Sequence, residues 1–538
     1  MTDPRGKTTT YTYDANGAAA SVTDPTGRKT TTSHNAIGWA TTTVTPAGNT
    51  HDGNPADHTT TYADFTGHGQ PETVTDALGH TTRYGYDAAG NLTDVTDANN
   101  RHTHTDHDPE NNPTVVTRPD TTTTASTYDD NGRPATVTDA LGHTTTYGYD
   151  AADRLTTTTD PLGHTTHYGY DDAGHRATVT DPAGHTTTTG YDPAEQATTV
   201  TDARGKTTTT VYDDLGRPTT VTDPDGHRTL TVHDSLGRRT RQDQGTTSPL
   251  TTTGTWTYDL AGNLLTDTDG TGHTTTYTYE DAGRLTATTD PLARTTTTGY
   301  DPDGRTAATT GPDGTTTSYT YDHAGRLTAI TYPDGHTLTR NYDNADRLTT
   351  VTDWADRTLT HTWAADNTLT TLAYPNGVTT TNTYNATKDL TATTAATTST
   401  TVLDLTYGYD DAGLLTQETD QTNQSDPVTR TYAYDPLARI NTVTGGDAPG
   451  AYTFDNAGHL TNTPTTTQLF DAAGQLTHSG TLTTPTTHTY NTLGQRTTTT
   501  TTPLGHDPDT TTYTYDAAGR LTTEGSRVSW RLVYPAVW

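Results

Sequence analysis

A 21-residue period constrains this chain more than any other feature of its sequence. An aromatic residue, most often tyrosine, recurs at that spacing, followed by Asp-x-x-Gly, a basic residue, threonine-rich sequence and Asp-Pro-x-Gly. About 24 units follow one another, with steps of 31, 25, 20 or 16 where loops change in length. Such a period predicts a repeat architecture in which each unit packs on its neighbours. The predicted structural anchors are Tyr86, Tyr128, Tyr149, Tyr170, Tyr191, Tyr212, Tyr258, Tyr279, Tyr300, Tyr321, Tyr342 and Trp363.

Two turn motifs divide each unit. The fifth residue of the segment that starts at the anchor is usually glycine, and otherwise often aspartate, as at Asp153 and Asp346, which predicts a left-handed backbone there. Glu195 and Ala438 fit this place less well, so their turns are predicted to differ. The second turn is Asp-Pro-x-Gly, as at residues 160–163, where proline presets the turn and glycine ends it.

The segments between the turns read as strands of about six to eight residues. In Tyr147-Gly148-Tyr149 the two rings share one face with period two, and no 3.6-residue period is present. The chain is therefore predicted to be all-β, an array of about 24 β-hairpins. Roughly 48 strands in one flat ribbon would extend about 230 Å, and open sheets rarely exceed ~10 strands without curling. We expect a curled or spiralling β-strip, either a solenoid or a hollow shell.

The composition limits the classes of function. Threonine supplies 151 of the 538 residues, and hydrophobic residues make up only 28%. Low hydrophobicity with a net charge of -33 is typical of disorder, but a disordered chain would not keep aromatic residues in register over hundreds of positions. The charge makes nucleic acid and anionic membranes poor partners. Cysteine is absent, which excludes disulfides, thiolate zinc sites and cysteine nucleophiles. No apolar run approaches the ~20 residues of a membrane span.

The motif Tyr-Asp-x-x-Gly-Arg-Leu followed by Asp-Pro-x-Gly, with close variants at residues 279–294 and 321–336, resembles the YD repeat of the RHS and teneurin-type proteins. The resemblance covers nearly the whole chain. It implies a β-strip that spirals into a large hollow shell. Bacterial members enclose a C-terminal toxin, and animal teneurins use the shell in cell-surface adhesion. It therefore implies a secreted or cell-surface protein, although no signal peptide is recognisable here.

The domain organisation expected is a repeat array over residues 1–524 and a short non-repeat tail over residues 525–538. Both ends read as cuts through a longer array. We therefore expect an incomplete shell whose partner is an enclosed C-terminal toxin or the remainder of a longer chain, with cell-surface glycans as the alternative partner. Within the tail, residues 528–534 are the most apolar stretch of the chain and the segment expected to self-associate.

Histidine is the first candidate for chemistry, with 23 copies. Most follow the second turn, where other units carry Arg or Lys, which cannot replace His as a metal ligand or general base. We therefore interpret this position as a polar partner of the turn aspartate. We expect no catalytic, metal-binding or cofactor-binding residue anywhere in the chain. These histidines are His80, His143, His164, His185, His227, His273 and His336, and the basic residues at the same place are Lys7, Arg28, Arg101, Lys206, Arg294 and Arg357.

Other motifs are incomplete. Gly-Lys-Thr at residues 6–8 and 205–207 lacks the first glycine of a phosphate-binding loop. The segment at residues 267–270 would need Glu, not Thr278, to complete an EF-hand loop. An aspartic dyad would draw on Asp160 and Asp181, but their separation is the repeat period and turn formation already accounts for them.

Three classes of function remain. The first is a non-catalytic shell or scaffold without cofactor, like the toxin-encapsulating region of polymorphic toxins. The second is a carbohydrate-binding or adhesion module, in which exposed Tyr and Trp rings stack on cell-surface glycans. The third is an enzyme, which no constellation in the sequence favours.

Overall fold

The computed structural model describes residues 1–446, 449–516 and 518–527. The apolar stretch at residues 528–534, which we expect to self-associate, lies outside these residues. The chain divides into two compact units: Met1–Tyr147 with Asp259–Asn263 and Thr276–Val428, and Gly148–Tyr258 with Leu264–Thr275 and Thr429–Trp538.

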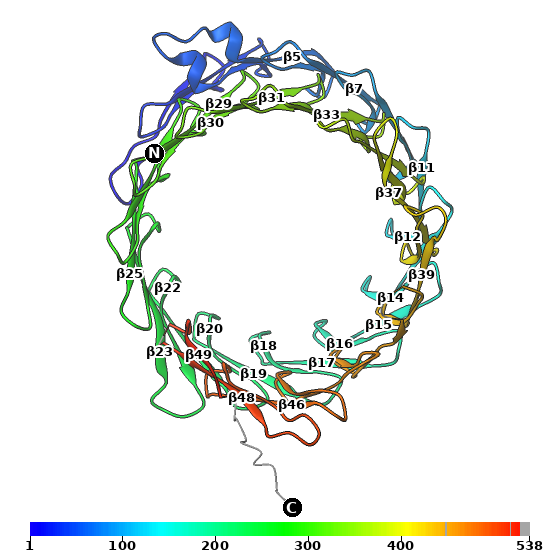
Figure 1. The fold of residues 1–538 in the computed structure, drawn as a ribbon. Coiled ribbons are helices and arrows are strands. Elements are labelled where there is room, and N and C mark those ends of the chain that lie inside the picture. Colours follow the sequence, from blue (N-terminus) through cyan, green and yellow to red (C-terminus); the bar gives the residue numbers. More distant parts are fainter. Residues whose placement is uncertain (447–448, 517, 528–538) are drawn as a thin grey trace, which may run out of the picture. The chain divides into compact units, whose positions relative to one another are not determined.

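The first unit holds, wholly or for the greater part, β1 to β13 and β25 to β38 (Figure 1). Their bounds are β1 Thr10–Tyr13, β2 Ala19–Thr23, β3 Lys29–His34, β4 Ala40–Val44, β5 Thr59–Phe65, β6 Pro71–Thr75, β7 Thr81–Tyr86, β8 Leu92–Thr96, β9 His102–His107, β10 Pro113–Thr117, β11 Thr123–Tyr128, β12 Pro134–Thr138, β13 Thr144–Tyr149, β25 Thr274–Tyr279, β26 Leu285–Thr289, β27 Thr295–Tyr300, β28 Thr306–Thr310, β29 Thr316–Tyr321, β30 Leu327–Thr331, β31 Thr337–Tyr342, β32 Leu348–Thr352, β33 Thr358–Trp363, β34 Leu369–Ala373, β35 Thr379–Tyr384, β36 Leu390–Ala396, β37 Thr401–Tyr409 and β38 Leu415–Asp420.

The second unit holds the remaining strands in the same way. Their bounds are β14 Leu155–Thr159, β15 Thr165–Tyr170, β16 Arg176–Thr180, β17 Thr186–Tyr191, β18 Ala197–Thr201, β19 Thr207–Tyr212, β20 Pro218–Thr222, β21 Arg228–His233, β22 Arg239–Gly245, β23 Thr251–Tyr258, β24 Leu264–Asp269, β39 Val428–Tyr434, β40 Ile440–Thr444, β41 Gly450–Ala451, β42 Thr453–Phe454, β43 Leu460–Asn462, β44 Thr467–Phe470, β45 Leu476–Gly480, β46 Pro485–Tyr490, β47 Arg496–Thr501, β48 Asp509–Tyr515 and β49 Leu521–Arg527.

The prediction of an all-β hairpin array is confirmed. β1 to β41 belong to a sheet of 41 strands and β42 to β49 to a sheet of 8. Strands pair antiparallel with the next strand along the chain, as Thr157 with His167 between β14 and β15, and Thr178 with Thr188 between β16 and β17. A bulge recurs at the anchor, where Tyr170 pairs with Arg176 after a register shift. Strands of five or six residues follow from the 21-residue unit, because two five-residue turns occupy the rest.

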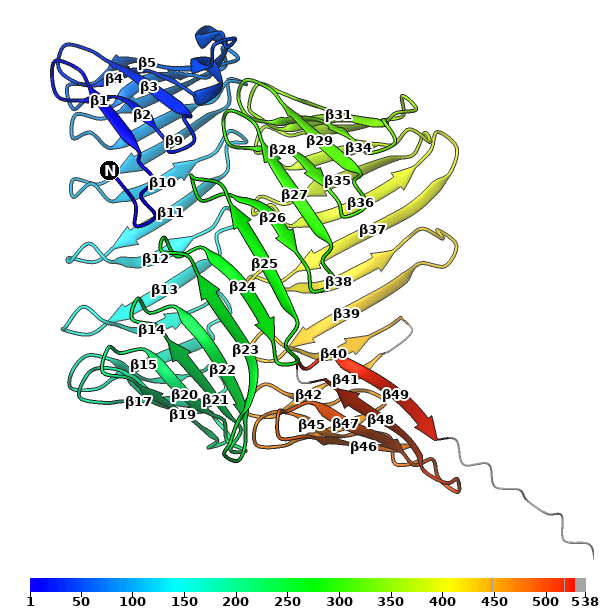
Figure 2. The same ribbon diagram turned by 90° about the vertical axis from the view of Figure 1, so that its left-hand side faces the viewer.

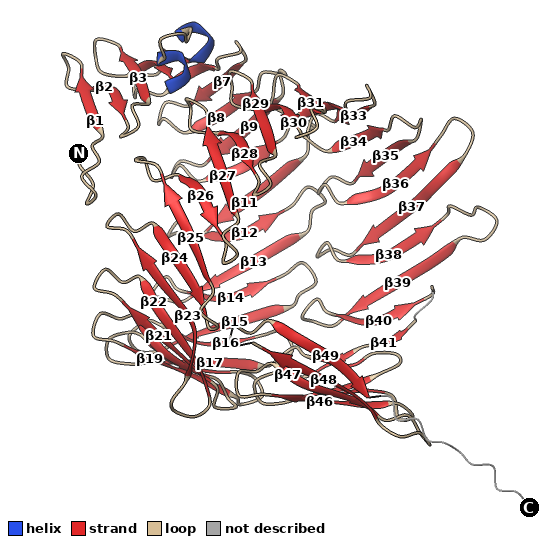
Figure 3. Ribbon diagram, turned by 60° about the vertical axis from the view of Figure 1, so that its left-hand side comes forward, coloured by secondary structure: helices blue, strands red, loops and turns tan. Residues whose placement is uncertain are grey.

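Longer steps between anchors produce local additions to this pattern. The 31-residue step accommodates two 3-10 helices, η1 Pro46–Asn49 and η2 Pro55–His58, which are the only helical segments in the described part of the chain (Figure 3). Of the four 25-residue steps, those from His233 to Tyr258 and from Tyr384 to Tyr409 lengthen the strands of a hairpin most. β22 and β23 have 7 and 8 residues, and β36 and β37 have 7 and 9 (Figure 2).

Side-chain burial is low throughout the described residues. Ala395, at 9% exposure, is the one buried hydrophobic residue among them, and no large side chain is fully buried. Of the few buried polar residues, Asp243 and Thr393 lie on the two long hairpins. The strip is therefore held by hydrogen bonds and half-buried rings rather than by a solid apolar core.

Within each unit, later hairpins contact hairpins about 250 residues earlier. In the first unit Arg28 pairs with Glu280 at 3.1 Å, and the Ala47 N–H donates to Asp303 at 2.7 Å. In the second, Arg204 donates to the carbonyl of Asp471 at 3.2 Å. We call these contacts the seam of each unit. The strip inside a unit thus packs against itself, as expected of a strip that curls.

Candidate functional site

The two turns of each 21-residue repeat share one hydrogen-bonding scheme. In the first turn, Oδ1 of Asp150 accepts the backbone N–H groups of Ala152 at 2.9 Å and Arg154 at 3.0 Å, and Oδ2 accepts Nε of Arg154 at 2.8 Å. In the second, Oδ1 of Asp160 accepts from the N–H groups of Leu162 at 3.0 Å and His164 at 2.8 Å, and Oδ2 contacts Nδ1 of His164 at 3.0 Å. One carboxylate therefore organises each turn.

Glu195 and Ala438 do not change this turn, contrary to the sequence prediction. Their φ angles are 65° and 59°, like the 65° of Asp153. Their N–H groups donate to the carbonyls of Asp192 at 2.9 Å and Asp435 at 3.0 Å, which is the bond made by glycine elsewhere. The aspartate at the first position and the backbone ladder therefore hold the turn even where a β-carbon must accept the left-handed conformation.

The electrostatics of the turns follow from these bonds. Hydrogen bonds from the Arg217 side chain, and then from its backbone, lower the pKa of Asp213 to about 2. The pKa values of Asp129 and Asp290 are also lowered, first by the side chains of Arg133 and Arg294. The carboxylates therefore stay ionised well into the acid range.

The histidines after the second turn occupy the place that the sequence interpretation gives them. Nδ1 lies 3.1 Å from the carboxylate four residues earlier in His80, His143 and His185, and 3.0 Å in His164 and His227. Arg294 and Arg357 place Nε 2.7 Å from the equivalent aspartates. His273 lies 3.5 Å from Asp269, whereas His336 turns to Asp334 at 2.6 Å because Tyr332 stands at the usual aspartate position.

The anchors bond one repeat to the next. The Tyr170 hydroxyl donates to the carbonyl of Leu155 at 2.8 Å, and the Arg154 guanidinium lies 4.6 Å from the centre of the same ring. Trp363 keeps the bond through Nε1, which donates to the carbonyl of Leu348 at 2.8 Å. The hydroxyl bond to a carbonyl 15 residues earlier recurs in Tyr86, Tyr128, Tyr191, Tyr212, Tyr300, Tyr321 and Tyr342, and Tyr258 reaches 19 residues back.

The anchors are distributed, not gathered. Each lies at the last residue of a different strand: Tyr149 ends β13 and Tyr279 ends β25, for example. Within a unit, one anchor follows another at the repeat spacing along the strip. This arrangement can stiffen successive hairpins but does not converge on a reacting atom.

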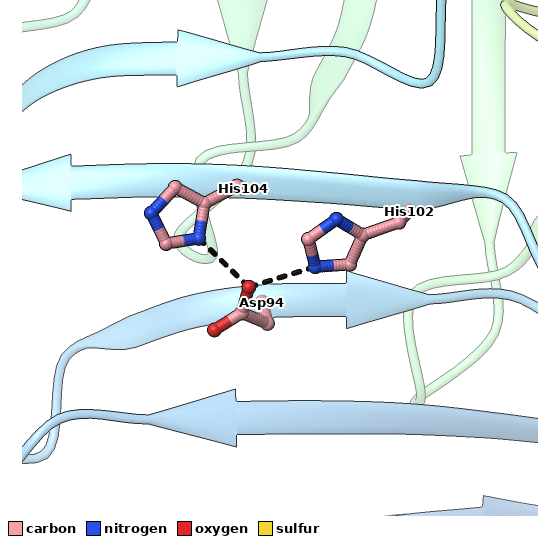
Figure 4. A group of neighbouring side chains, drawn as sticks. All are labelled: Asp94, His102 and His104. Carbon is pink, nitrogen blue, oxygen red and sulfur yellow. Dashed lines mark hydrogen bonds and ion pairs between the residues drawn. The ribbon is translucent and has the colours of Figure 1, made fainter.

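Two groups of metal-ligating side chains occur in the first unit. Asp94 on β8 meets His102 and His104 on β9, with ligand atoms that all lie within 4.8 Å of one another (Figure 4). Asp76, His80 and Asp346 form the second group. In the second group Asp346 pairs with Arg326 at 2.7 Å, and the pair of Asp76 and His80 is the common turn contact.

The sequence interpretation missed the first group. The signal was present as His-x-His-x-Asp in residues 102–106, where alternation on a strand places both histidines on one face. These two histidines stand at strand positions, outside the periodic register of the turn histidines. Asp94 could be added only from the strand pairing, which places it opposite His104.

Exposed aromatic rings gather at one place in the first unit. The rings of Trp354 and Tyr332 lie 6.0 Å apart edge to face, and the His336 ring lies 4.8 Å from that of Trp354. Trp354 is 50% exposed and Tyr332 37%. A separate cleft in the second unit, about 430 Å³, is lined mainly by apolar side chains, among them Tyr452, Phe454 and Leu460.

No helix in the described ranges is both long and apolar enough to span a bilayer.

Comparisons with known proteins agree with this geometry. The pattern of the family described as RHS Repeat matches eleven segments, and that described as Teneurin YD-shell matches residues 354–535. No curated protein sequence matches the chain. The RHS Repeat segments are residues 13–50, 65–102, 86–123, 128–165, 152–186, 170–207, 191–229, 212–248, 258–295, 300–337 and 324–358.

Solved structures share the fold at low sequence identity. The structure described as TcdB2-TccC3 has a TM-score of 0.60 and 17% identity over 96% of this chain. The Tc holotoxin pore of Photorhabdus luminescens, with the TccC3-D651A mutation, has a TM-score of 0.62 and 16% identity over 97% of this chain. The aligned region covers 31% and 37% of those chains, so this chain spans about a third of their length.

Proposed function

Because the chain belongs to the RHS repeat family, we propose that it acts as a non-catalytic shell that encloses another polypeptide, in the manner of the toxin-encapsulating region of a polymorphic toxin. The observation that carries the proposal is the succession of hairpins whose turn carboxylates are already bonded to their own turns, as those of Asp150 and Asp160 are. Such groups serve the architecture and are not poised to transfer a proton.

The likeness to TcdB2-TccC3 supports the proposal at the level of the fold. Since this chain corresponds to about a third of that chain, its partner is a further segment of a longer protein, a C-terminal toxin being the simplest candidate. A shell of this kind works outside the cell that makes it, so we place the protein in the secreted or cell-surface compartment.

Protease protection tests enclosure directly. The complete reading frame of the gene is expressed, and the segment that follows the array is compared in the full chain and alone during limited proteolysis. An enclosed segment survives in the full chain and is digested alone. Equal digestion in both would reject the proposal. Arg204→Ala in the seam of the second unit should make an enclosed segment easier to digest, whereas Lys206→Ala in the same turn should not.

Carbohydrate binding is the second candidate, favoured by the exposed rings of Tyr332 and Trp354. Aromatic faces that are open to water can stack on the apolar faces of sugars. A glycan array is the test. The ring of Trp39 lies 5.3 Å from that of Phe65, away from this cluster, and serves as the control. Saturable binding that is lost in Trp354→Ala and retained in Trp39→Phe would support this function. An array without any saturable signal would remove it.

A further inference from the structure

Three potential metal ligands converge on one face of the β8–β9 hairpin (Figure 4). Nδ1 of His104 and Nε2 of His102 both lie 2.7 Å from Oδ1 of Asp94. Asp94 is directly opposite His104 in the strand pairing, and His102 is two residues away along the same strand. The three side chains thus approach one point from the same side of the sheet.

The repeat shows that this convergence is a departure from the pattern. Two repeats later, Thr136 pairs with Thr146 between β12 and β13, in the register of Asp94 and His104. The equivalent of His102 is Thr144, which bonds through its hydroxyl to Thr138 at 2.8 Å. Three positions that carry threonine in an ordinary hairpin therefore carry one carboxylate and two imidazoles here, and the turns do not require them.

A second carboxylate orients one of the imidazoles. Oδ1 of Asp106 lies 3.2 Å from Nε2 of His104, the ring nitrogen opposite the one that meets Asp94. A histidine that binds a metal commonly donates its other N–H to a carboxylate, which fixes the ring and the tautomer. His104 is therefore aimed with Nδ1 towards the common point.

Gly85 on β7 leaves room for the third ligand. It pairs with Asp94, and a β-carbon at Gly85 would lie only 3.0 Å from both Cβ and Oδ2 of Asp94. The Asp94 side chain consequently lies between Gly85, which has no side chain, and the two histidines. This position limits where its carboxylate can turn.

We propose that Asp94, His102 and His104 bind one divalent transition-metal ion of the Zn²⁺ type. Two imidazole nitrogens and a carboxylate oxygen are a common ligand set for zinc, with metal–ligand distances of about 2.0–2.2 Å and a fourth position open to water. The nitrogen ligands select against Ca²⁺ and Mg²⁺, which prefer oxygen. The ion replaces the protons that lie between the two ring nitrogens and Oδ1, and these protons leave to solvent.

The site is open enough for exchange with solvent. His102 is 54% exposed and His104 40%.

Zinc binding to the full chain tests the proposal. The protein is dialysed against Zn²⁺ in the presence of a weak chelator. The amount of zinc bound per chain is then measured by elemental mass spectrometry. The triple variant Asp94→Thr, His102→Thr, His104→Thr restores the residues of a standard hairpin and should lose one equivalent of zinc. His167→Thr is the matched control, because His167 has the register of His104 but faces Thr157; it should lose none.

A second variant separates ligation from fold. Asp106→Asn leaves all three ligands in place and should weaken zinc binding by about 10–100-fold, as loss of an orienting carboxylate does. Co²⁺ can be bound in place of Zn²⁺ as a spectroscopic probe. Its visible absorption should disappear in the triple variant and persist in His167→Thr. Unchanged zinc content in the triple variant, an equal loss in His167→Thr, or an Asp106→Asn affinity equal to wild type would each overturn the proposal.

Discussion

The turn aspartate is the residue that contributes most regularly to this structure. Its carboxylate accepts two backbone N–H groups and contacts a basic side chain, as Asp150 and Asp160 show. Because the same scheme holds both turns, the two sequence motifs Asp-x-x-Gly-Arg and Asp-Pro-x-Gly-His are one structural element. The fourth place in the turn needs a positive φ, and only there does the choice between glycine and another residue matter.

Matched substitutions at that fourth place test the backbone argument. Ala438 has a φ of 59° and Gly216 a φ of 76° in equivalent turns. A left-handed conformation costs a residue with a β-carbon about 1–2 kcal/mol, and glycine loses about 0.4–1 kcal/mol more entropy on folding. Ala438→Gly should therefore raise the free energy of unfolding by up to about 1 kcal/mol, and Gly216→Ala should lower it by a similar amount. Chemical denaturation measures both, and effects of the same sign would contradict the argument.

The turn carboxylates also predict a dependence on pH. The pKa of Asp213 in the folded protein is about 2, below the 3.8 of an unperturbed group, because of its bonds to Arg217. A carboxyl group whose pKa is lower in the folded than in the unfolded state stabilises the protein at pH values above its unfolded-state pKa. This stabilisation is lost as the pH falls through the folded-state pKa. The turn carboxylates should therefore leave the melting temperature unchanged from pH 7 to about 4 and lower it between about 4 and 2. Circular dichroism melts provide the measurement, and Asp213→Asn should reduce the loss below pH 4. An unchanged melting temperature at pH 2.5 would disprove the prediction.

At the scale of the hairpin, the anchor ring acts together with the basic residue of the Asp-x-x-Gly turn one repeat earlier. Arg154 donates through Nε to Asp150 of the same turn, and its guanidinium lies over the ring of Tyr170 in the next repeat. Arg305 and Tyr321 repeat the contact at 4.7 Å, and His175 stacks on Tyr191 at 4.7 Å. Each of these turns is thereby connected to the second strand after it.

Substitution of one anchor measures this connection. The Tyr170 ring is half-buried, so Tyr170→Ala should cost about 2 kcal/mol, less than a fully buried aromatic. Tyr170→Phe removes only the bond to Leu155 and should cost about 1 kcal/mol. His164→Arg should change the free energy of unfolding by no more than about 0.5 kcal/mol, because Arg fills that position in other repeats. Equal losses for His164→Arg and Tyr170→Ala in denaturant titrations would refute these roles.

The hairpin is also the scale at which the sequence is most informative. The period predicts the strands, the turns and the all-β class, because backbone geometry and alternation are local. Glu195 and Ala438 were misjudged because their neighbours, not their own preferences, decide the turn. Asp94 was missed because its partners lie on another strand. The seam pair of Arg28 and Glu280 has no signal in a single sequence, since residues 252 positions apart meet only after the strip has formed.

At the scale of each whole unit, the seam replaces a core. In the second unit Arg204 donates to the carbonyls of Asp471 and Ala472, both at 3.2 Å, and Asp225 accepts the Ala473 N–H at 2.9 Å. Burial, with the nearby charge of Asp225, raises the pKa of Asp471. The array inside a unit is thus stabilised along the strip by strand pairing and across it by these sparse polar contacts.

Loss of a seam contact should loosen one place without unfolding the strip. Arg204→Ala should speed amide hydrogen exchange in the turn at residues 471–475 and leave exchange in β18 and β19 unchanged, because strand pairing does not depend on it. Lys206→Ala keeps the backbone N–H that donates to Asp202 and should leave both regions as in wild type. Hydrogen exchange with mass spectrometry compares the three proteins. Global acceleration in Arg204→Ala would show that the seam and the strip unfold together.

The scarcity of buried apolar side chains has a thermodynamic consequence. The heat-capacity increment of unfolding follows the apolar surface newly exposed to water, and polar exposure lowers it. Ala395 is the one buried hydrophobic residue among those described. Unfolding of this strip therefore exposes little additional apolar surface. Its increment should lie below the common value of about 12–15 cal/mol/K per residue, and its stability curve should be correspondingly flat. A stability that changes little between cold and warm surroundings would suit the secreted or cell-surface shell that we propose.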